Sequence, residues 1–412
     1  MRFYTGDEAG LIKVVDIDHK VSLLEAQSKA AKKVRADAKA KINAKPGEKV
    51  EIADNILSGV EVNNFSGSVS KERTVQQMIT GSYEDEQAFF VARKNGDIEA
   101  LSKATGQSLY VYSEPDFTEN ISVKHKGKYI NGRNYVGLGA GKEGFVSCSN
   151  MGEVRFQRFE DANSAGMMKL PVGVVKMRSH KDKFTLFAAG GHEQELSIWD
   201  AETACSGDSY LEPVSEPLFR SQNVEDDWLG LRVPVWITDM QFLDANTTNP
   251  QMAVSTGHKH IRIYDTKAQR RPVHSWEIGK NPILHTLASH VKPELFISDN
   301  LGNMQQLDLR NGKIVGSYKG IAGAVADMAL SEDGKKVAEV GLDRFLRVYE
   351  ADGMRRMLHR AYIKQRVTAV VWDWDVKDID QVDIDRQETE DIWESMETLG
   401  KKPNKRKAKE VV

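Results

Sequence analysis

Cysteine is scarce in this chain, with only Cys148 and Cys205 among 412 residues. Neither has a second cysteine or a histidine at the spacing of a zinc motif, so the sequence indicates neither a zinc site nor a disulfide framework. Such sparing use of cysteine favours a reducing compartment, the cytosol or the nucleus.

Long apolar runs are also missing. No stretch approaches the roughly 18 residues of a membrane helix, and the first 16 residues lack the basic start and apolar core of a signal peptide. The formal net charge of −3 gives no overall field that would favour nucleic acid or a membrane. These absences predict a soluble intracellular protein with no membrane partner.

Motifs for catalysis and cofactors fail on their surroundings. The segment 139–144 (GAGKEG) matches GxGxxG, but a strand-like segment follows it where a dinucleotide site requires a helix. His192 and Glu193 begin like the zinc motif HExxH, but Leu196 stands at the fifth position. No GxSxG nucleophile motif is present. We therefore predict no enzyme activity, no cofactor and no metal site.

What the chain does have is one unit that recurs seven times. The unit is an apolar strand, a turn of Gly, Asn or Asp, and an alternating strand, at residues 2–16, 88–101, 144–156, 186–200, 252–265, 295–309 and 337–350. Alternation with period two indicates half-buried strands, and the turn residues supply the positive φ of tight hairpins. A lone hairpin cannot bury its apolar face, so the copies must stack.

The spacing of the units indicates how they stack. The later hairpins recur about every 40–45 residues, the spacing of a four-stranded propeller blade. Segments that precede the hairpins are expected to be the innermost strands of the blades, at residues 75–80, 173–178, 237–243, 283–289 and 325–331.

The two ends of the repeat array complement each other. The first hairpin has no strand before it, and the last is followed by one further strand pair, 361–364 and 367–372. We expect 367–372 to pair with the N-terminal hairpin, which removes open sheet edges. The predicted fold class is all-β, a seven-bladed WD-repeat β-propeller closed by N- and C-terminal strands sharing a blade, with a flexible C-terminal tail.

We expect two domains. The propeller spans 1–372, with a polar insertion at about 19–71 whose Ala- and Lys-rich middle predicts a mobile loop or a marginal helix. Residues 110–134 and 201–234 are further irregular stretches. Residues 373–412 are acidic and then basic, and we expect a mostly disordered tail with a short helix.

Basic residues form two candidate binding clusters on loops that connect one blade to the next. The first holds Arg270 and Arg271, and the second holds Arg355, Arg356, Arg360 and Arg366. One hypothesis places both clusters on one rim of the propeller. Two interpretations stay open, namely solvated loop charge, or contact with phosphate or an acidic protein surface.

The tail carries two further candidates. The run KKPNKRKAK indicates a nuclear-import or RNA-backbone segment, and its candidate residues are Lys401, Lys402, Lys405, Arg406 and Lys407. Trp393 lies in the amphipathic stretch DIWESMETL, which suggests a helix that docks in a groove of a partner. A dispensable, unoccupied tail is the alternative.

Four longer segments resemble signature segments of one family. They are 190–200 (GGHEQELSIWD), 226–243 (DDWLGLRVPVWITDMQFL), 255–273 (STGHKHIRIYDTKAQRRPV) and 340–350 (VGLDRFLRVYE). The chain is similar in these segments to the nucleolar Nop-seven-associated family of ribosome biogenesis proteins. The second segment keeps Trp228, Leu229, Leu231, Arg232, Pro234, Val235 and Trp236. The resemblance runs from the first hairpin to about residue 372.

The resemblance implies a non-catalytic scaffold in the nucleolar assembly of the large (60S) ribosomal subunit and in rRNA processing. It also implies partners among the assembly factors of the pre-60S particle, contact with rRNA, release by an ATPase of the AAA class, and a monomeric state within the particle. The expected location is the nucleus, in the nucleolus. The alternative is a generic WD-repeat adaptor for a ubiquitin ligase or a chromatin complex, because a fold does not determine a function.

Overall fold

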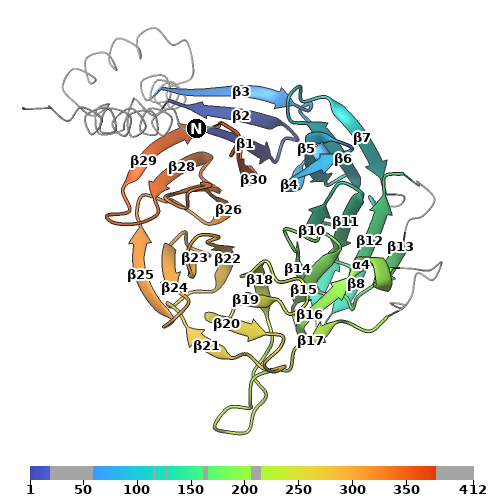
Figure 1. Ribbon diagram of the computed structural model, residues 1–412, viewed down its shortest axis with the longest axis vertical. Helices are drawn as coiled ribbons and strands as arrows, with labels where there is room; N and C mark the ends of the chain where they lie inside the picture. Colours follow the sequence, from blue (N-terminus) through green and yellow to red (C-terminus); the bar gives the residue numbers. More distant parts are fainter. Residues whose placement is uncertain are drawn as a thin grey trace, which may run out of the picture.

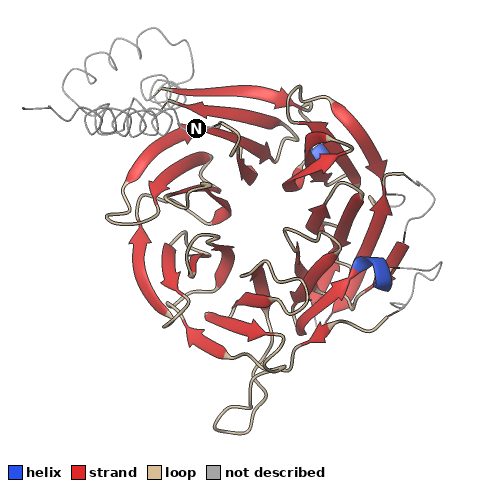
Figure 2. Ribbon diagram, viewed as in Figure 1, coloured by secondary structure: helices blue, strands red, loops and turns tan. Residues whose placement is uncertain are grey.

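The protein is built from short antiparallel strands arranged around a centre (Figures 1 and 2). The computed structural model describes residues 1–18, 59–114, 117–119, 121–125, 128–160, 166–205 and 215–376. In these ranges the helices are single turns, η1 (Lys71–Arg73) and α4 (Ala201–Ala204). None of the described helices is long and apolar enough to cross a membrane.

Six blades take their four strands consecutively from the chain, with the innermost strand first. Blade 1 is β4 (Val75–Tyr83), β5 (Glu86–Arg93), β6 (Asp97–Ser102) and β7 (Ser108–Ser113); blade 2 is β10 (Tyr135–Ala140), β11 (Gly144–Ser149), β12 (Glu153–Arg158) and β13 (Gly166–Lys169); blade 3 is β14 (Val174–Ser179), β15 (Leu186–Gly191), β16 (Gln194–Asp200) and β17 (Phe219–Arg220).

The second half of the chain repeats the pattern. Blade 4 is β18 (Ile237–Phe242), β19 (Gln251–Thr256), β20 (His260–Asp265) and β21 (His274–Glu277); blade 5 is β22 (Ile283–Ala288), β23 (Glu294–Asp299), β24 (Met304–Asp308) and β25 (Lys313–Tyr318); blade 6 is β26 (Val325–Leu330), β27 (Lys336–Gly341), β28 (Phe345–Glu350) and β29 (Met357–Tyr362). All seven predicted hairpins are present as the two middle strands of their blades.

Blade 7 is shared between the two ends of the chain, as predicted. Its order from the centre outward is β30 (Val367–Trp372), β1 (Arg2–Asp7), β2 (Ile12–Ile17) and β3 (Val60–Ser66). β1 and β30 are antiparallel, with Phe3 opposite Trp372. The Phe3 side chain is fully buried and its ring centroid lies 4.5 Å from that of Trp372. This pairing closes the ring of blades and covers the edge of β1 that the N-terminal hairpin alone would leave open.

One expectation about this region was wrong. The predicted insertion at about 19–71 contains β3, which pairs with β2 and supplies the outer strand of blade 7. Of the two strands expected after the last hairpin, the first belongs to β29, which pairs with β28 in blade 6. The second is β30, which pairs with β1 as expected.

The core lies between neighbouring blades. Each group of buried apolar residues combines side chains of adjacent sheets, for example Val340 and Leu346 of blade 6 with Phe3 and Val15 of blade 7. Successive side chains of a strand point to opposite faces of its sheet, and strands such as β5, β11 and β23 are buried on both faces, so every sheet contacts two neighbours. The fold therefore depends on stacking and not on any single blade.

Two stretches that we expected to be irregular contain short elements. Residues 110–134 include the end of β7 and a separate hairpin of β8 (Ser122–His125) and β9 (Lys128–Asn131). Residues 201–234 include α4 and the short outer strand β17.

The packed part of the chain continues past Trp372, where we had placed the end of the propeller. Asp373 is buried, and its Oδ1 lies 2.6 Å from Nζ of Lys103 in blade 1. The indole N–H of Trp374 donates to the carbonyl of Leu330 in blade 6 at 3.0 Å. The Trp374 ring also lies 5.2 Å from the His290 ring and 4.7 Å from Lys181 Nζ. Residues 373 and 374 therefore stabilise the propeller.

Candidate interaction surfaces of the propeller

The direction of the strands divides the loops between two faces. Neighbouring strands of a blade are antiparallel, so the turn between the second and third strands emerges on the same face as the connection to the next blade. We call this the hairpin face. The remaining turns emerge on the opposite face.

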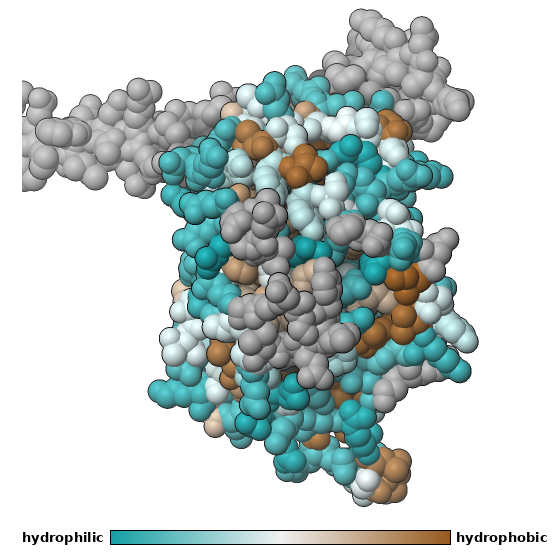
Figure 3. All heavy atoms as spheres, turned by 90° about the vertical axis from the view of Figure 1, so that its right-hand side faces the viewer, coloured by the Kyte–Doolittle hydropathy of each residue, from teal (hydrophilic) through white to brown (hydrophobic). Residues whose placement is uncertain are grey.

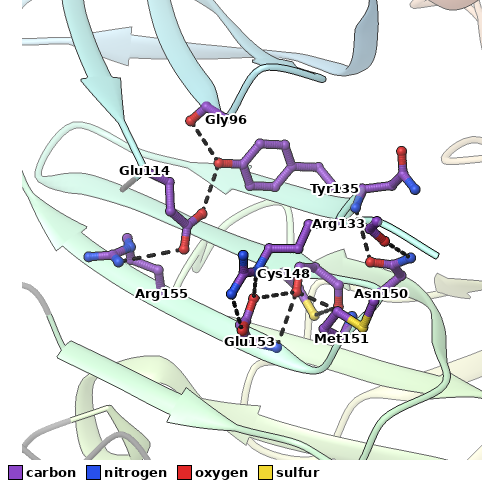
Figure 4. Close-up of polar contacts among 12 residues, drawn as sticks. Gly96, Glu114, Arg133, Tyr135, Cys148, Asn150, Met151, Glu153 and Arg155 are labelled. Atoms are coloured by element: carbon purple, nitrogen blue, oxygen red, sulfur yellow. Dashed lines mark hydrogen bonds and ion pairs between the residues drawn. The ribbon is translucent and has the colours of Figure 1, made fainter. Parts of the chain in front are cut away.

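Buried polar side chains join blades 1 and 2 beside the hairpin face (Figure 4). The Tyr135 hydroxyl lies 2.9 Å from Glu114 Oε2 and 3.0 Å from the carbonyl of Gly96. Glu114 Oε1 lies 3.5 Å from Nη2 of Arg155, whose guanidinium stands 5.0 Å from the Tyr112 ring centroid. Burial raises the pKa of both Tyr135 and Glu114. These contacts join the end of blade 1 to the first and third strands of blade 2.

The two cysteines are buried and carry no activated thiol. Burial raises the pKa of Cys148, and it raises that of Cys205 to about 12. Only a thiolate is a strong nucleophile, so neither residue is prepared for covalent chemistry.

Charged side chains also occupy the innermost strands, around the centre of the ring. Lys176 and Arg178 lie on β14, Asp239 on β18, His285 on β22 and Asp327 on β26. The guanidinium of Arg178 contacts Asp239 with Nε to Oδ1 at 3.3 Å. Among the residues that the structure describes, no three His, Cys, Asp or Glu side chains are grouped so that they could hold a metal ion.

Their electrostatics suit a structural network. Burial alone would raise the pKa of Asp239, but the cations of Arg178 and Lys176 outweigh it and hold that pKa below its ordinary value. Asp239 Oδ2 accepts the N–H of Thr286 in blade 5 at 2.9 Å. Asp327 Oδ2 likewise accepts the N–H of Val370 in blade 7 at 3.0 Å. Asp239 thus links blade 4 to blade 5, and Asp327 links blade 6 to blade 7.

The first predicted basic cluster lies at the outer side of blades 3 and 4. Arg270 and Arg271 are exposed in the loop between β20 and β21. The carbonyl of Arg270 accepts the N–H of Gln222, and Nη1 of Arg271 lies 2.6 Å from Oε1 of Glu225. Both arginines therefore contact the connection between β17 and β18.

The second predicted basic cluster is divided. Arg355 and Arg356 precede β29, and Arg366 follows it, so this strand of six residues separates them by roughly 20 Å. Arg355 donates from Nε to Oε1 of Gln306 at 2.9 Å, which makes it part of blade 5–blade 6 packing. Arg360 lies on β29 with its guanidinium 4.8 Å from the Phe345 ring centroid.

The hypothesis that both basic clusters lie on blade-connecting loops of one rim therefore needs correction in part. Arg270, Arg271, Arg355 and Arg356 lie in turns between the third and fourth strands of their blades, and these turns emerge on the same face. Arg366, which is exposed like Arg356, lies at the other end of β29 in the connection to blade 7, on the hairpin face. The remaining predicted site residues, Trp393, Lys401, Lys402, Lys405, Arg406 and Lys407, lie outside the described residues.

A site that the sequence analysis did not single out lies on the connection between β17 and β18, residues 221–236. This connection projects from the ring at the lower edge of Figure 1, and hydrophobic spheres gather at the lowest point of the molecule in Figure 3. The side chains of Trp228, Leu229 and Leu231 are 89%, 59% and 60% exposed. We call residues 227–231 the Trp228 tip.

The Trp228 tip is an ordered turn. The N–H groups of Leu229 and Leu231 both donate to Oδ1 of Asp227 at 2.9 Å. The N–H of Gly230 donates to the Asp227 carbonyl at 2.8 Å, and the N–H of Asp227 donates to the Leu231 carbonyl at 2.9 Å. Gly230 has φ of +72°, which glycine adopts without strain. These polar groups are therefore hydrogen-bonded within the turn, and the apolar side chains are exposed to solvent.

The base of the connection is tied to blades 3 and 4. Asn223 Nδ2 donates to the carbonyl of Val233 at 2.6 Å, which joins the two arms. Nη1 of Arg232 lies 2.7 Å from Oε2 of Glu193, in the hairpin turn of blade 3. Trp236 covers Gly257 so closely that a Cβ there would lie 2.2 Å from the indole ring. These contacts fix where the Trp228 tip projects.

The signal for this site was present in the sequence. Three large apolar residues within WLGL follow two aspartates and precede a proline, in a stretch that lacks strand alternation. From the sequence alone these residues support only the family resemblance, because exposure is a property of the folded chain.

Comparisons with known proteins agree with the resemblance. No family model matches the chain. It is 30% identical over 271 residues to WD repeat-containing protein 74 of Bos taurus, covering 62% of this chain and 67% of that protein. It is 29% identical over 282 residues to WD repeat-containing protein 74 of Homo sapiens, with 65% and 70% covered. It is 28% identical over 376 residues to ribosome biogenesis protein nsa1 of Schizosaccharomyces pombe, with 82% and 90% covered.

Among solved structures, the β-propeller domain of Cps50 (Swd1) from Myceliophteria thermophila superposes with a TM-score of 0.53. The alignment covers 70% of this chain and 89% of that domain at 14% sequence identity. At that identity the likeness concerns the fold alone, and it supports the all-β propeller.

Proposed function

Since the chain belongs to the family of WD repeat-containing protein 74 and the ribosome biogenesis protein NSA1, we propose that it is a non-catalytic scaffold in the assembly of the large (60S) ribosomal subunit in the nucleolus, with a part in rRNA processing. Family membership over most of the chain is the observation that carries the proposal. The described residues add support, because buried carboxylates such as Asp239 and Asp327 are engaged in joining blades.

The partners in this proposal are other assembly factors of the pre-60S particle. A rigid ring of blades offers surfaces of fixed shape for protein contacts. Exposed Arg356 and Arg366, together with the basic residues 401–409, are the candidates for contact with rRNA phosphates. We further propose that the protein is monomeric within the particle and is released by an ATPase of the AAA class.

The proposal is tested by affinity purification of the full-length chain from nuclear extract, followed by gradient sedimentation and identification of the bound RNA and protein. The expected result is co-sedimentation with precursors of the large subunit and recovery of precursor rRNA. A chain that migrates only as a free monomer would overturn the proposal. Recovery of ubiquitin-ligase or chromatin subunits with short modified peptides would instead favour the adaptor function.

A further inference from the structure

We propose that the Trp228 tip is a docking element that inserts into an apolar pocket with a basic rim on a partner protein. The proposal rests on the function proposed above, and it places the partner protein among the assembly factors of the large-subunit precursor. It concerns residues 227–231, outside both predicted basic clusters.

Exposure of the tip is the first argument. Soluble proteins scatter single apolar residues over their surface, but a contiguous group of large ones marks an interaction site. Trp228, Leu229 and Leu231 stand within four positions of one another and are all more than half exposed. Tryptophan is also one of the residue types, with tyrosine and arginine, that are enriched among the energetically dominant residues at the centre of protein interfaces. A tip of this composition suits burial in a pocket of matching shape.

Order in the tip is the second argument. The turn is closed by four hydrogen bonds that involve the carboxylate and backbone of Asp227. Its base is fixed by the Asn223–Val233 bond and the Arg232–Glu193 ion pair. A group held in its binding conformation loses less conformational entropy on association, which strengthens binding without adding contacts.

Charge near the tip selects the class of partner. Arg271 is paired with Glu225, and Arg232 is paired with Glu193. Within residues 226–231, the only charged side chains are those of Asp226 and Asp227. The exposed Arg270 lies nearer the base of the connection, where its carbonyl accepts the N–H of Gln222. Carboxylates repel RNA phosphates and anionic lipid headgroups, and they attract lysine or arginine. An apolar pocket with a basic rim on a protein fits both features.

The first test compares two triple variants of the full-length chain by gradient sedimentation. The tip variant is Trp228→Ala, Leu229→Ala and Leu231→Ala, and the matched control is Val111→Ala, Ile314→Ala and Val315→Ala on the exposed outer strands β7 and β25. We expect the tip variant to reduce the fraction bound to large-subunit precursors about tenfold or more, as hot-spot residues do. The control should bind like the wild type.

Thermal melting of both triple variants checks that they are folded. If the tip variant does not fold, the single variant Trp228→Ala replaces it in the sedimentation experiment. Unchanged binding of a folded tip variant overturns the docking proposal and leaves the proposed function standing. If the wild-type chain itself never sediments with precursors, the proposed function falls, and the docking proposal falls with it.

The second test identifies what the tip touches. A photo-crosslinking phenylalanine analogue replaces Leu229 in the full-length chain, and precursor particles that contain it are isolated and irradiated. The expected product is a crosslink to another protein, within an apolar segment that has lysine or arginine nearby. Crosslinks to rRNA, or to a second copy of the chain, would overturn the proposal.

Discussion

His285 shows how the environment of one residue sets its chemistry. Burial lowers its pKa to about 4, and the nearby cations Lys176 and Arg178 act in the same direction, whereas Asp239 opposes them. In the unfolded chain the imidazole binds its proton near pH 6.5. Between about pH 6.5 and 4 the unfolded state therefore binds more protons than the folded state. The free energy of unfolding is higher above this window and decreases as the pH falls through it.

Replacement of this histidine tests the argument. Between pH 7 and pH 5 the free energy of unfolding of the wild type should decrease by on the order of 1–2 kcal/mol more than that of His285→Gln, because glutamine does not titrate. Urea denaturation at the two pH values measures the difference. His274→Gln, at an exposed histidine, is the matched control and should behave as the wild type. Equal pH dependence in wild type and His285→Gln would contradict the assignment.

At the scale of elements, hairpins with alternating side chains were predictable and single strands were less so. β10 was missed because Gly137 and Gly139 weaken the strand pattern in YVGLGA. These glycines are required by packing, since a Cβ at either position would lie within 2.5 Å of Met177 or Ser179 on β14. β3 was missed because an outer strand with one partner needs few apolar residues, and its pairing with β2 is distant in sequence.

The closure of blade 7 gives a prediction at this scale. Phe3→Ala should lower the free energy of unfolding by about 3–5 kcal/mol, because it leaves a cavity at the pairing of β1 with β30. Val111→Ala on the exposed outer strand β7 should change it by about 0.5 kcal/mol or less. Denaturant titration of both variants checks the pair. Equal small effects would mean that the clasp adds little to stability.

For the whole molecule, the sequence predicted the ring of blades but not which side chains share a surface. The basic residues around β29 are close in sequence, yet the strand carries Arg356 and Arg366 to opposite faces. The Trp228 tip is built within one connection, but its exposure depends on how blades 3 and 4 hold the base. Surface sites depend on the arrangement of blades, which local periodicity does not encode.

The basic end of the chain is expected to act on location and not on folding. Deletion of 401–412 removes all six lysines and arginines of KKPNKRKAK. We expect weaker nucleolar retention and more salt-sensitive loss of RNA from the purified particle, since each lost phosphate contact reduces binding. Fluorescence imaging and salt titration measure these effects. A lowered melting temperature in this deletion would contradict the separation of roles.

Closure of the ring depends on a short extension as well as on the shared blade. Trp374 reaches from blade 7 to Leu330 of blade 6, His290 of blade 5 and Lys181 of blade 3, so it links blades that are not sequential neighbours. A chain ending at residue 372 should therefore melt on the order of 5 °C below a chain ending at residue 376, as expected for a loss of a few kcal/mol in a domain of this size. Trp374→Ala in the longer chain should reproduce most but not all of the decrease, because the Asp373–Lys103 ion pair remains in this variant. Circular dichroism melts at one scan rate compare the three proteins, and identical melting of the two truncations would show that β30 alone completes the ring.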